Sequence, residues 1–410
     1  MAEFVAVYRS GPPAAQEAMK TLKTSKHVVL LGGGVSLEEE VELKQAAAER
    51  GLLLLGPECG TATIEGTSYG FANVVRQGTV GIVGTLGTGI QEVSCLVDEV
   101  GISHILGVGA RDLSQKVGGI GTLSALKFLE ADETTEIIVL ISRAPATSVA
   151  HLVLNAVGTI GKPAVVCFLG DDAKLIFKAG ATPAVTFEDA AVKAVALARG
   201  EKPKAINFTL PPREIQSLAE REHSKFGYGQ KYIRGLFSGS GLCMEAMMIL
   251  QELVGDVYSN VPLRPRLRLP DSRSSKRHTC VDFEAEEFAR GAPHPIINFD
   301  LRCQRILKEA RDWEVATLLS DVVLGQGAHP DPAYELAEAV EEAKSITDRE
   351  GGYLSVVMSV VGTSRDPQNF SLQCKKLEKA GAIVMPSNAQ AARMAALIAT
   401  HGDVWKKMSL

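Results

Sequence analysis

The sequence predicts an α/β protein built mainly of parallel sheets. Short aliphatic runs alternate with stretches whose apolar residues recur at helical spacing, which is typical of βαβ units with buried strands. Glycine is plentiful, with 39 residues, and aromatic residues make up only 5% of the chain, which favours a globular α/β protein over a disordered or membrane chain. The predicted strands are Phe4–Tyr8, His27–Leu31, Leu52–Leu55, Val80–Gly84, His104–Val108, Ile137–Ser142, Ala164–Leu169, Ile233–Phe237, Val315–Leu324, Leu354–Val361 and Ala382–Pro386.

A chain of 410 residues is long enough for two or three domains, each with its own core. The stretch Glu201–Pro212 is charged and contains proline, so it is a plausible linker. The strand and helix pattern restarts after it and is interrupted by a proline-bearing segment at about residues 256–295, for which we predict an irregular insertion. The predicted domains are residues 1–78, 79–204 and 205–410.

Bulk properties exclude several classes of protein. A net charge of −5 argues against a general nucleic-acid binder. Seven scattered cysteines without a CxxC pair predict reduced thiols in a cytoplasmic protein, with neither a disulfide framework nor a zinc site, and we expect no metal ligands. We expect no signal peptide and no membrane partner, because the amino terminus lacks a basic region before a long apolar run and no apolar stretch is long enough for a spanning helix.

Two segments run from a short strand through a glycine turn into a helix. They are Thr79–Glu92 and Tyr232–Met247. The first backbone N–H groups of a helix are unpaired and lie at the positive end of its dipole, so each turn is a potential phosphate or carboxylate site. Two such starts in one chain predict a single anion bound between two helix N-termini. The predicted binding residues are Thr85, Gly87, Thr88 and Gly89 in the first turn and Ser238, Gly239, Ser240 and Gly241 in the second. The alternative is that these glycines only form tight turns.

Two further loops follow predicted strands and contain an arginine. They are Gly107–Asp112 and Gly362–Pro367. Arg111 and Arg365 are candidate catalytic residues that bind an anionic substrate in bidentate fashion. The alternatives are a local pairing of Arg111 with its neighbouring aspartate and an ordinary turn at the second loop. The predicted binding residues in these loops are Gly109 and Thr363.

One histidine is a candidate for acid–base chemistry. His294 lies between Pro293 and Pro295, and an unperturbed imidazole titrates near neutrality. A purely structural role fits the sequence equally well. A dense basic patch at residues 264–277 lacks interleaved aromatic residues and is followed by acidic ones, which favours a solvated or partner-facing loop over a nucleic-acid groove.

These motifs also carry a family resemblance. Residues 79–146 and 162–200 resemble the ligase domain of the succinyl-CoA synthetase α subunit, and residues 232–255 and 296–400 resemble the carboxy-terminal domain of its β subunit. A chain that joins both halves is similar to the FdrA family. The motifs that carry this similarity are Gly109-Ala110-Arg111-Asp112-Leu113-Ser114, Gly118-Gly119, His294-Pro295 and Gly362-Thr363-Ser364-Arg365-Asp366-Pro367.

The resemblance implies a fold with two flavodoxin-like domains of the succinyl-CoA synthetase type. A partial Rossmann-like, CoA-binding-type domain at residues 1–78 precedes them, and its amino-terminal glycine loop is missing. The phosphohistidine of succinyl-CoA synthetase and the glutamate that braces it are replaced by Lys178 and Arg143 in our alignment. No ATP-grasp region is present. We therefore expect that partner subunits complete the protein and that it forms an oligomer.

The expected function is acyl or carbamoyl group transfer of the FdrA type. The reaction that suits the site is attack on an acyl or carbamoyl phosphate, with an oxamate carbamoyltransferase subunit as one form of it. Such a transfer needs alignment of acceptor and donor but no covalent enzyme nucleophile. The first alternative is an acyl-CoA synthetase (acid–thiol ligase) subunit that lacks the phosphohistidine, and the second is a non-catalytic scaffold or small-molecule sensor. No cofactor is predicted with certainty; CoA and carbamoyl phosphate are candidate substrates.

Overall fold

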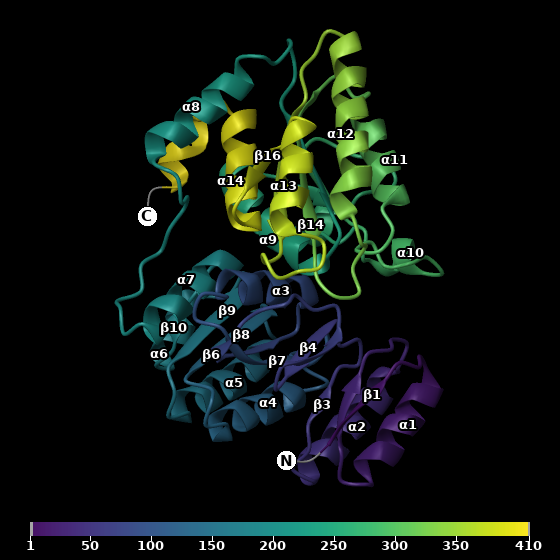
Figure 1. Ribbon diagram of the computed structural model, residues 1–410, viewed down its shortest axis with the longest axis vertical. Helices are drawn as coiled ribbons and strands as arrows, with labels where there is room; N and C mark the ends of the chain where they lie inside the picture. The colour runs from purple at the N-terminus through teal and green to yellow at the C-terminus, as the bar shows by residue number, and fades with distance from the viewer. Residues whose placement is uncertain (1–2, 409–410) are drawn as a thin grey trace. The chain divides into compact units, whose positions relative to one another are not determined.

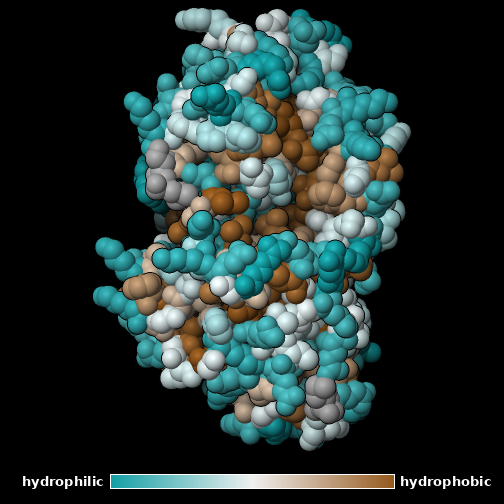
Figure 2. Space-filling model, turned by 60° about the vertical axis from the view of Figure 1, so that its left-hand side comes forward, coloured by the Kyte–Doolittle hydropathy of each residue, from teal (hydrophilic) through white to brown (hydrophobic). Residues whose placement is uncertain are grey.

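The computed structural model describes residues 3–408 of the chain. The chain forms two compact units, which are divided in the sequence between Lys204 and Ala205 (Figure 1). Residues 201–211, where the linker was predicted, form neither helix nor strand. Figure 2 shows hydrophilic side chains interspersed with hydrophobic ones on the face that it draws. No helix among residues 3–408 is both long and apolar enough to cross a membrane.

Unit 1 begins with a small parallel sheet of three strands in the order β1-β2-β3. Its second and third strands are buried, whereas most of the first is half-buried. The helix before the third strand starts with a capping box between Ser36 and Glu39. The elements are β1 (Phe4–Val7), α1 (Pro12–Leu22), β2 (His27–Leu30), α2 (Leu37–Glu49) and β3 (Leu54–Leu55).

The larger sheet of unit 1 has seven strands in the order β10-β9-β8-β6-β7-β4-β5. Helices α3 and α7 pack together, as do α4 and α5, and Figure 1 shows these pairs on opposite faces of the sheet. The strands are β4 (Thr61–Ile64), β5 (Thr67–Gly70), β6 (Gln77–Gly84), β7 (Ile102–Gly107), β8 (Ile137–Arg143), β9 (Ala164–Leu169) and β10 (Thr182–Pro183). The helices are α3 (Gly87–Leu96), α4 (Ile120–Ala131), α5 (Thr147–Thr159), α6 (Ala173–Lys178) and α7 (Phe187–Ala198). Strands β4 and β5 come from before residue 78, so this sheet extends across the first predicted domain boundary.

Unit 2 contains one parallel sheet of six strands in the order β12-β13-β11-β14-β15-β16. Its strands are β11 (Tyr232–Phe237), β12 (Tyr258–Ser259), β13 (Thr279–Asp282), β14 (Val315–Val323), β15 (Ser355–Val361) and β16 (Ile383–Met385). Its helices are α8 (Pro212–His223), α9 (Ser240–Val254), α10 (Glu286–Ala289), α11 (Asp300–Glu309), α12 (Pro332–Arg349), α13 (Phe370–Lys379) and α14 (Asn388–Ala399), with short 3-10 turns η1 (Pro265–Leu267) and η2 (Asp403–Met408).

The segment predicted as an irregular insertion contains two strands of the sheet, β12 and β13. Strand β13 lies between β11 and β12, and all four of its residues are buried. The sequence pattern missed it because Thr-Cys-Val-Asp is a short run of mixed polarity after a basic stretch, with no aliphatic run to mark it. The rest of the segment, which includes η1 and α10, is largely irregular as expected.

Five strands of each unit follow the same flavodoxin-like order. The order is β7-β6-β8-β9-β10 in unit 1 and β13-β11-β14-β15-β16 in unit 2. In each set the strand that comes first along the chain, β6 or β11, lies between the strands that come second and third along the chain. All neighbouring pairs in both sets are parallel. In such sheets ligands bind at the carboxyl ends of the strands, where the order reverses. That point lies between β6 and β8 in unit 1 and between β11 and β14 in unit 2.

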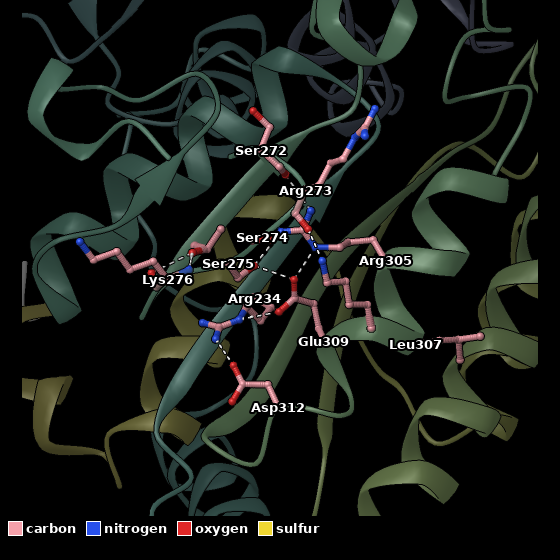
Figure 3. Close-up of polar contacts among 12 residues, drawn as sticks. Arg234, Ser272, Arg273, Ser274, Ser275, Lys276, Arg305, Leu307, Glu309 and Asp312 are labelled. Carbon is pink, nitrogen blue, oxygen red and sulfur yellow. Dashed lines mark hydrogen bonds and ion pairs between the residues drawn. The ribbon is translucent and has the colours of Figure 1, made fainter. Parts of the chain in front are cut away.

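The basic segment of unit 2 is fixed to α11 by a buried carboxylate (Figure 3). Glu309 pairs with Arg234 of β11 at 2.7 Å and also pairs with Arg305. The same carboxylate accepts a hydrogen bond from the hydroxyl of Ser275 at 2.6 Å, and Arg305 donates to the carbonyl of Ser272. Part of the predicted solvated loop is therefore anchored to the fold by charged hydrogen bonds, which are stronger than neutral ones.

Candidate functional site

The α3 helix start in unit 1 is formed by the predicted residues and has no side-chain cap within the described part of the chain. Thr85 follows β6, and its hydroxyl lies 2.9 Å from the hydroxyl of Ser142 at the end of β8. Thr88 is buried in the first turn, and none of the described residues hydrogen-bonds its hydroxyl. Open N–H groups and a buried hydroxyl are suited to an anion.

The glycines of this turn differ in what they touch. A Cβ atom added at Gly89 would lie 2.5 Å from the ring of Phe187, so packing requires glycine there. A Cβ added at Gly87 would only reach the Cα of Gly60 at 3.8 Å, and one at Gly60 would reach the Cα of Gly87 at 3.7 Å. Packing thus does not demand glycine at these two positions, and their lack of side chains leaves space beside the helix start.

Arg111 is engaged by a buried charge cluster in unit 1. Its Nε lies 2.8 Å from a carboxylate oxygen of Glu40 on α2, and it donates to the carbonyl of Val35. Lys44 pairs with the same glutamate at 2.9 Å and with Asp112 at 2.7 Å. The side chains of both acidic residues and of Lys44 are at most 1% exposed, whereas Arg111 is 39% exposed. The alternative pairing of Arg111 with Asp112 is not what the structure shows, because Asp112 points to Lys44.

Asp112 also occupies a helix start of its own. Its carboxylate accepts hydrogen bonds from the backbone N–H groups of Gly121 and Thr122 and from the Thr122 hydroxyl, at 2.9, 2.8 and 2.6 Å. The α4 N-terminus is therefore filled by a protein carboxylate. Gly109 lies beside it with φ of +89°, and a Cβ there would lie 2.5 Å from the carbonyl oxygen of Pro57, so close backbone approach explains this predicted binding residue.

The α9 helix start in unit 2 is surrounded by carboxylates. Ser238 donates its N–H to Asp321 of β14 at 2.8 Å, and its hydroxyl also donates to that carboxylate. The N–H of Ser240 donates to Glu284 at 2.7 Å. Gly239, the N-cap residue, has no side chain to cap the helix. The backbone donors predicted to bind an external anion are thus partly satisfied by two acidic side chains of the same unit.

His294 lies beside this helix start, as part of a pair with Glu284. Its Nε2 is 3.5 Å from Glu284, and its Nδ1 accepts a hydrogen bond from the N–H of Ile296 at 3.2 Å. A neutral ring therefore carries its proton on Nε2, facing the carboxylate. Burial raises the pKa of Glu284, but the hydrogen bonds from His294 and Ser240 outweigh it and hold that pKa below its ordinary value.

The last predicted loop forms a turn closed by its own aspartate. Thr363 is buried, and its N–H donates to the Asp366 carboxylate at 2.7 Å, while its hydroxyl accepts from the N–H of Arg365. Arg365 is exposed. These contacts are those of the structural turn, and the anion-binding role of Arg365 stays a prediction. Arg143 and Lys178, which stand at the two family positions, are both exposed.

Sequence reasoning missed several polar residues at the strand ends of unit 2. Arg302 of α11 is 1% exposed; its Nη1 donates to the carbonyl of Asp321 at 2.8 Å and lies 3.4 Å from its carboxylate. Asp321 was detectable, because a carboxylate within the apolar run Val315–Val323 needs a buried partner. Glu284 and Arg302 gave no such signal, since they stand in polar segments.

Two family models match this chain. The model for the CoA-binding domain matches residues 75–170, and the model for CoA-ligase matches residues 236–398. The first match falls on the larger sheet of unit 1, which the sequence analysis assigned to a ligase-type domain. A CoA-binding-type role for residues 1–78 stays a prediction.

A curated relative covers almost the whole chain. The protein YahF of Escherichia coli K12 is 42% identical over 392 residues, which are 95% of this chain and 75% of that protein. The chain belongs to the YahF family. It is an α/β protein with CoA-binding and CoA-ligase domains of the succinyl-CoA synthetase-like type.

This chain is also similar to more distant proteins and solved structures. The ADP-forming sulfoacetate–CoA ligase subunit SqwL of an Acholeplasma species is 27% identical over 156 residues, covering 35% of this chain and 50% of that protein. The dinucleotide-forming acetyl-coenzyme A synthetase 1 of Ca. Korarchaeum cryptofilum is 16% identical with a TM-score of 0.34, over 100% of this chain and 86% of that chain. The ATP citrate lyase of Methanothrix soehngenii is 14% identical with a TM-score of 0.42, over 99% and 82%. At these TM-scores the two structures carry no argument about activity.

Proposed function

We propose that this chain is an acyl-transfer subunit, which moves an acyl group between phosphate and the thiol of CoA. The observation that carries this proposal is the α3 helix start: open backbone N–H groups, a buried Thr88 hydroxyl, and space left by Gly60 and Gly87, within the stretch that matches the CoA-binding model. The CoA-ligase match in unit 2 and the similarity to a CoA ligase subunit favour CoA as the acceptor.

The proposed reaction is attack of the CoA thiolate on an acyl phosphate. A C–S bond forms, the bond between the acyl carbon and the phosphate oxygen breaks, and inorganic phosphate leaves with the bonding pair. Backbone N–H groups at a helix start neutralise the charge that grows on the departing phosphate, a stabilisation of roughly 3–4 kcal/mol per donor in other enzymes. We assign this role to the residues from Thr85 to Gly89. The expectation that the α9 start shares the same anion stays a prediction.

Roles for the remaining predicted residues follow from their contacts. The Nε2 of His294 lies 3.5 Å from Glu284, and we assign His294 the acid–base role in unit 2. The side chain of Arg111 is partly exposed, and it remains a candidate anion ligand, as does the exposed Arg365. Because the related SqwL is a ligase subunit, we also propose that the chain works with partner subunits.

Carbamoyl transfer is the narrower alternative within the same chemistry. The FdrA resemblance implies it, and carbamoyl phosphate differs from an acyl phosphate only in having an amino group on the carbonyl carbon. The same helix start therefore suits its phosphate equally well. What separates the two is the acceptor, which is CoA in one case and a small amide such as oxamate in the other.

Calorimetry on the purified chain tests this proposal. We expect phosphate and CoA to bind. Gly87→Ala should weaken the binding of phosphate without changing the fold, since its methyl group enters the open space. Carbamoyl phosphate binding without CoA binding would favour the carbamoyl alternative. If phosphate, carbamoyl phosphate, CoA and ATP all fail to bind, alone and with co-expressed partners, the chain is a scaffold or a sensor of another ligand.

A further inference from the structure

A cavity of about 400 Å³ lies within unit 2, beside the His294 segment. Its wall is mainly apolar, and the segment that carries His294 contributes both flanking prolines. The lining residues are Phe283, Phe288, Gly291, Ala292, Pro293, Pro295, Asn298, Asp300, Leu301, Arg302 and Gln304. The volume is that of a small-molecule site, and an apolar wall with a few polar groups is typical of one.

Arg302 is the buried polar group of this cavity. Only Nη1 is occupied, by the backbone carbonyl and the carboxylate of Asp321. Among residues 3–408, no hydrogen-bond partner meets Nε or Nη2 of this side chain. These two nitrogens lie on the same edge of the guanidinium plane and form a fork of parallel N–H donors. A buried donor without a partner is costly, because it has lost its water without replacement.

We propose that this fork binds the carboxylate of a small organic acid, with its hydrocarbon part against Phe283, Phe288 and Leu301. Two free N–H groups match the two oxygens of a carboxylate. Asp321 lies 3.4 Å from Arg302, and Asp300 also lines the cavity. A phosphate dianion brings twice the negative charge of a carboxylate to these two acidic residues, so it is disfavoured relative to a carboxylate.

The cavity is connected to the α9 helix start through one residue. The backbone carbonyl of Asp321 accepts a hydrogen bond from Arg302. Its carboxylate accepts hydrogen bonds from the N–H and the hydroxyl of Ser238. An acid held by Arg302 thus lies in the same polar network as the helix start and its His294–Glu284 pair. The binding of an organic acid in unit 2 does not depend on the proposed function.

Ligand-observed NMR titration of the full chain with propionate tests the site, without CoA or any phosphate donor. We expect propionamide, its neutral isostere, to bind at least tenfold more weakly, because the fork needs an anion. Arg302→Lys is expected to weaken propionate at least tenfold, since a point charge does not reproduce the fork. Arg311→Gln is the matched control: it removes an exposed arginine that follows the same helix, and propionate affinity should stay within twofold.

A second variant protects the test against misfolding. Ala292→Trp fills the cavity from its exposed rim and leaves Arg302 untouched, so it should abolish propionate binding while the far-UV spectrum is unchanged. Equal binding of propionate and propionamide, unchanged affinity in Arg302→Lys, or binding of inorganic phosphate at this arginine instead would overturn the inference. Carboxylate binding without acyl transfer would remove the proposed function alone, whereas acyl transfer without propionate binding would remove the site alone.

Discussion

The two flavodoxin-like sheets share a strand order and differ in charge where that order reverses. In unit 1 the point between β6 and β8 holds two neutral hydroxyls, those of Thr85 and Ser142. In unit 2 the point between β11 and β14 holds Ser238, the buried carboxylate of Asp321 and, behind it, Arg302. The same topology thus produces an open helix start in unit 1. In unit 2 the N–H groups of the helix start are bound by acidic side chains of the same unit. Backbone order decides where a site lies, and side chains decide which ligand it accepts.

The largest expected effect comes from removing the buried negative charge of Asp321 in unit 2. Asp321→Ala removes the counter-charge of the buried Arg302 and the carboxylate that accepts from the Ser238 N–H, so we expect a loss of about 3–5 kcal/mol of unfolding free energy. Urea unfolding followed by tryptophan fluorescence measures it, because Trp313 and Trp405 both lie in unit 2.

The matched variant in unit 1 is Ser142→Ala. It removes one neutral hydrogen bond, which contributes about 1 kcal/mol, and circular dichroism follows its unfolding. Equal losses in the two variants would show that charge at the reversal point does not distinguish the two sheets.

Acid should destabilise unit 2 through a buried histidine. Burial and the nearby charge of Arg234 lower the pKa of His278 to about 4. The unfolded chain binds this proton near pH 6.5 and the folded one does not, so unit 2 is most stable above pH 6.5 and loses stability as pH falls towards 4. The loss is roughly 3 kcal/mol at most. Tryptophan-detected unfolding at pH 7 and pH 5 measures it, and His278→Gln should flatten this dependence.

The two glycines of the unit 1 turn should behave in opposite ways. Gly89→Ala places a methyl group against Phe187, and such overpacking destabilises by about 1–3 kcal/mol. Gly87→Ala meets no close atom and gains helix propensity, so its stability should be equal or higher. Thermal unfolding compares the two variants. A destabilised Gly87→Ala would mean that this glycine is structural, and that the open helix start is not kept for a ligand.

The smallest expected effect concerns the carboxylate at the α9 start. Glu284→Gln keeps the shape but removes the charge from the helix dipole, which should cost about 0.3–1 kcal/mol of stability. It should also raise the affinity of unit 2 for phosphate, since the competing anion is gone. Calorimetry on this variant and on Glu286→Gln, an exposed neighbour, provides the comparison. Unchanged phosphate affinity would show that Glu284 does not compete with phosphate for the N–H groups of the helix start.

Sequence periodicity located most of the framework. The buried aliphatic runs, such as Ala164–Leu169, became strands with nearly the predicted bounds, and both glycine turns open a helix, because these features depend on neighbours along the chain. Strand β13 was missed for the same reason, as its partners are β11 and β12 and not its sequence neighbours.

By itself the sequence determined the α/β class, the two strand–turn–helix units and the candidate polar loops. Only the tertiary structure decided which charges meet. Arg111 faces Glu40 from 71 positions earlier in the chain, and Glu284 reaches the N–H of Ser240. Arg302, two of whose nitrogens have no hydrogen-bond partner among residues 3–408, lines a cavity. These contacts join residues far apart in sequence, and their geometry depends on how helices and loops pack on the sheet. Local pattern determines backbone conformation, whereas the pairing of buried charges is set by packing in three dimensions.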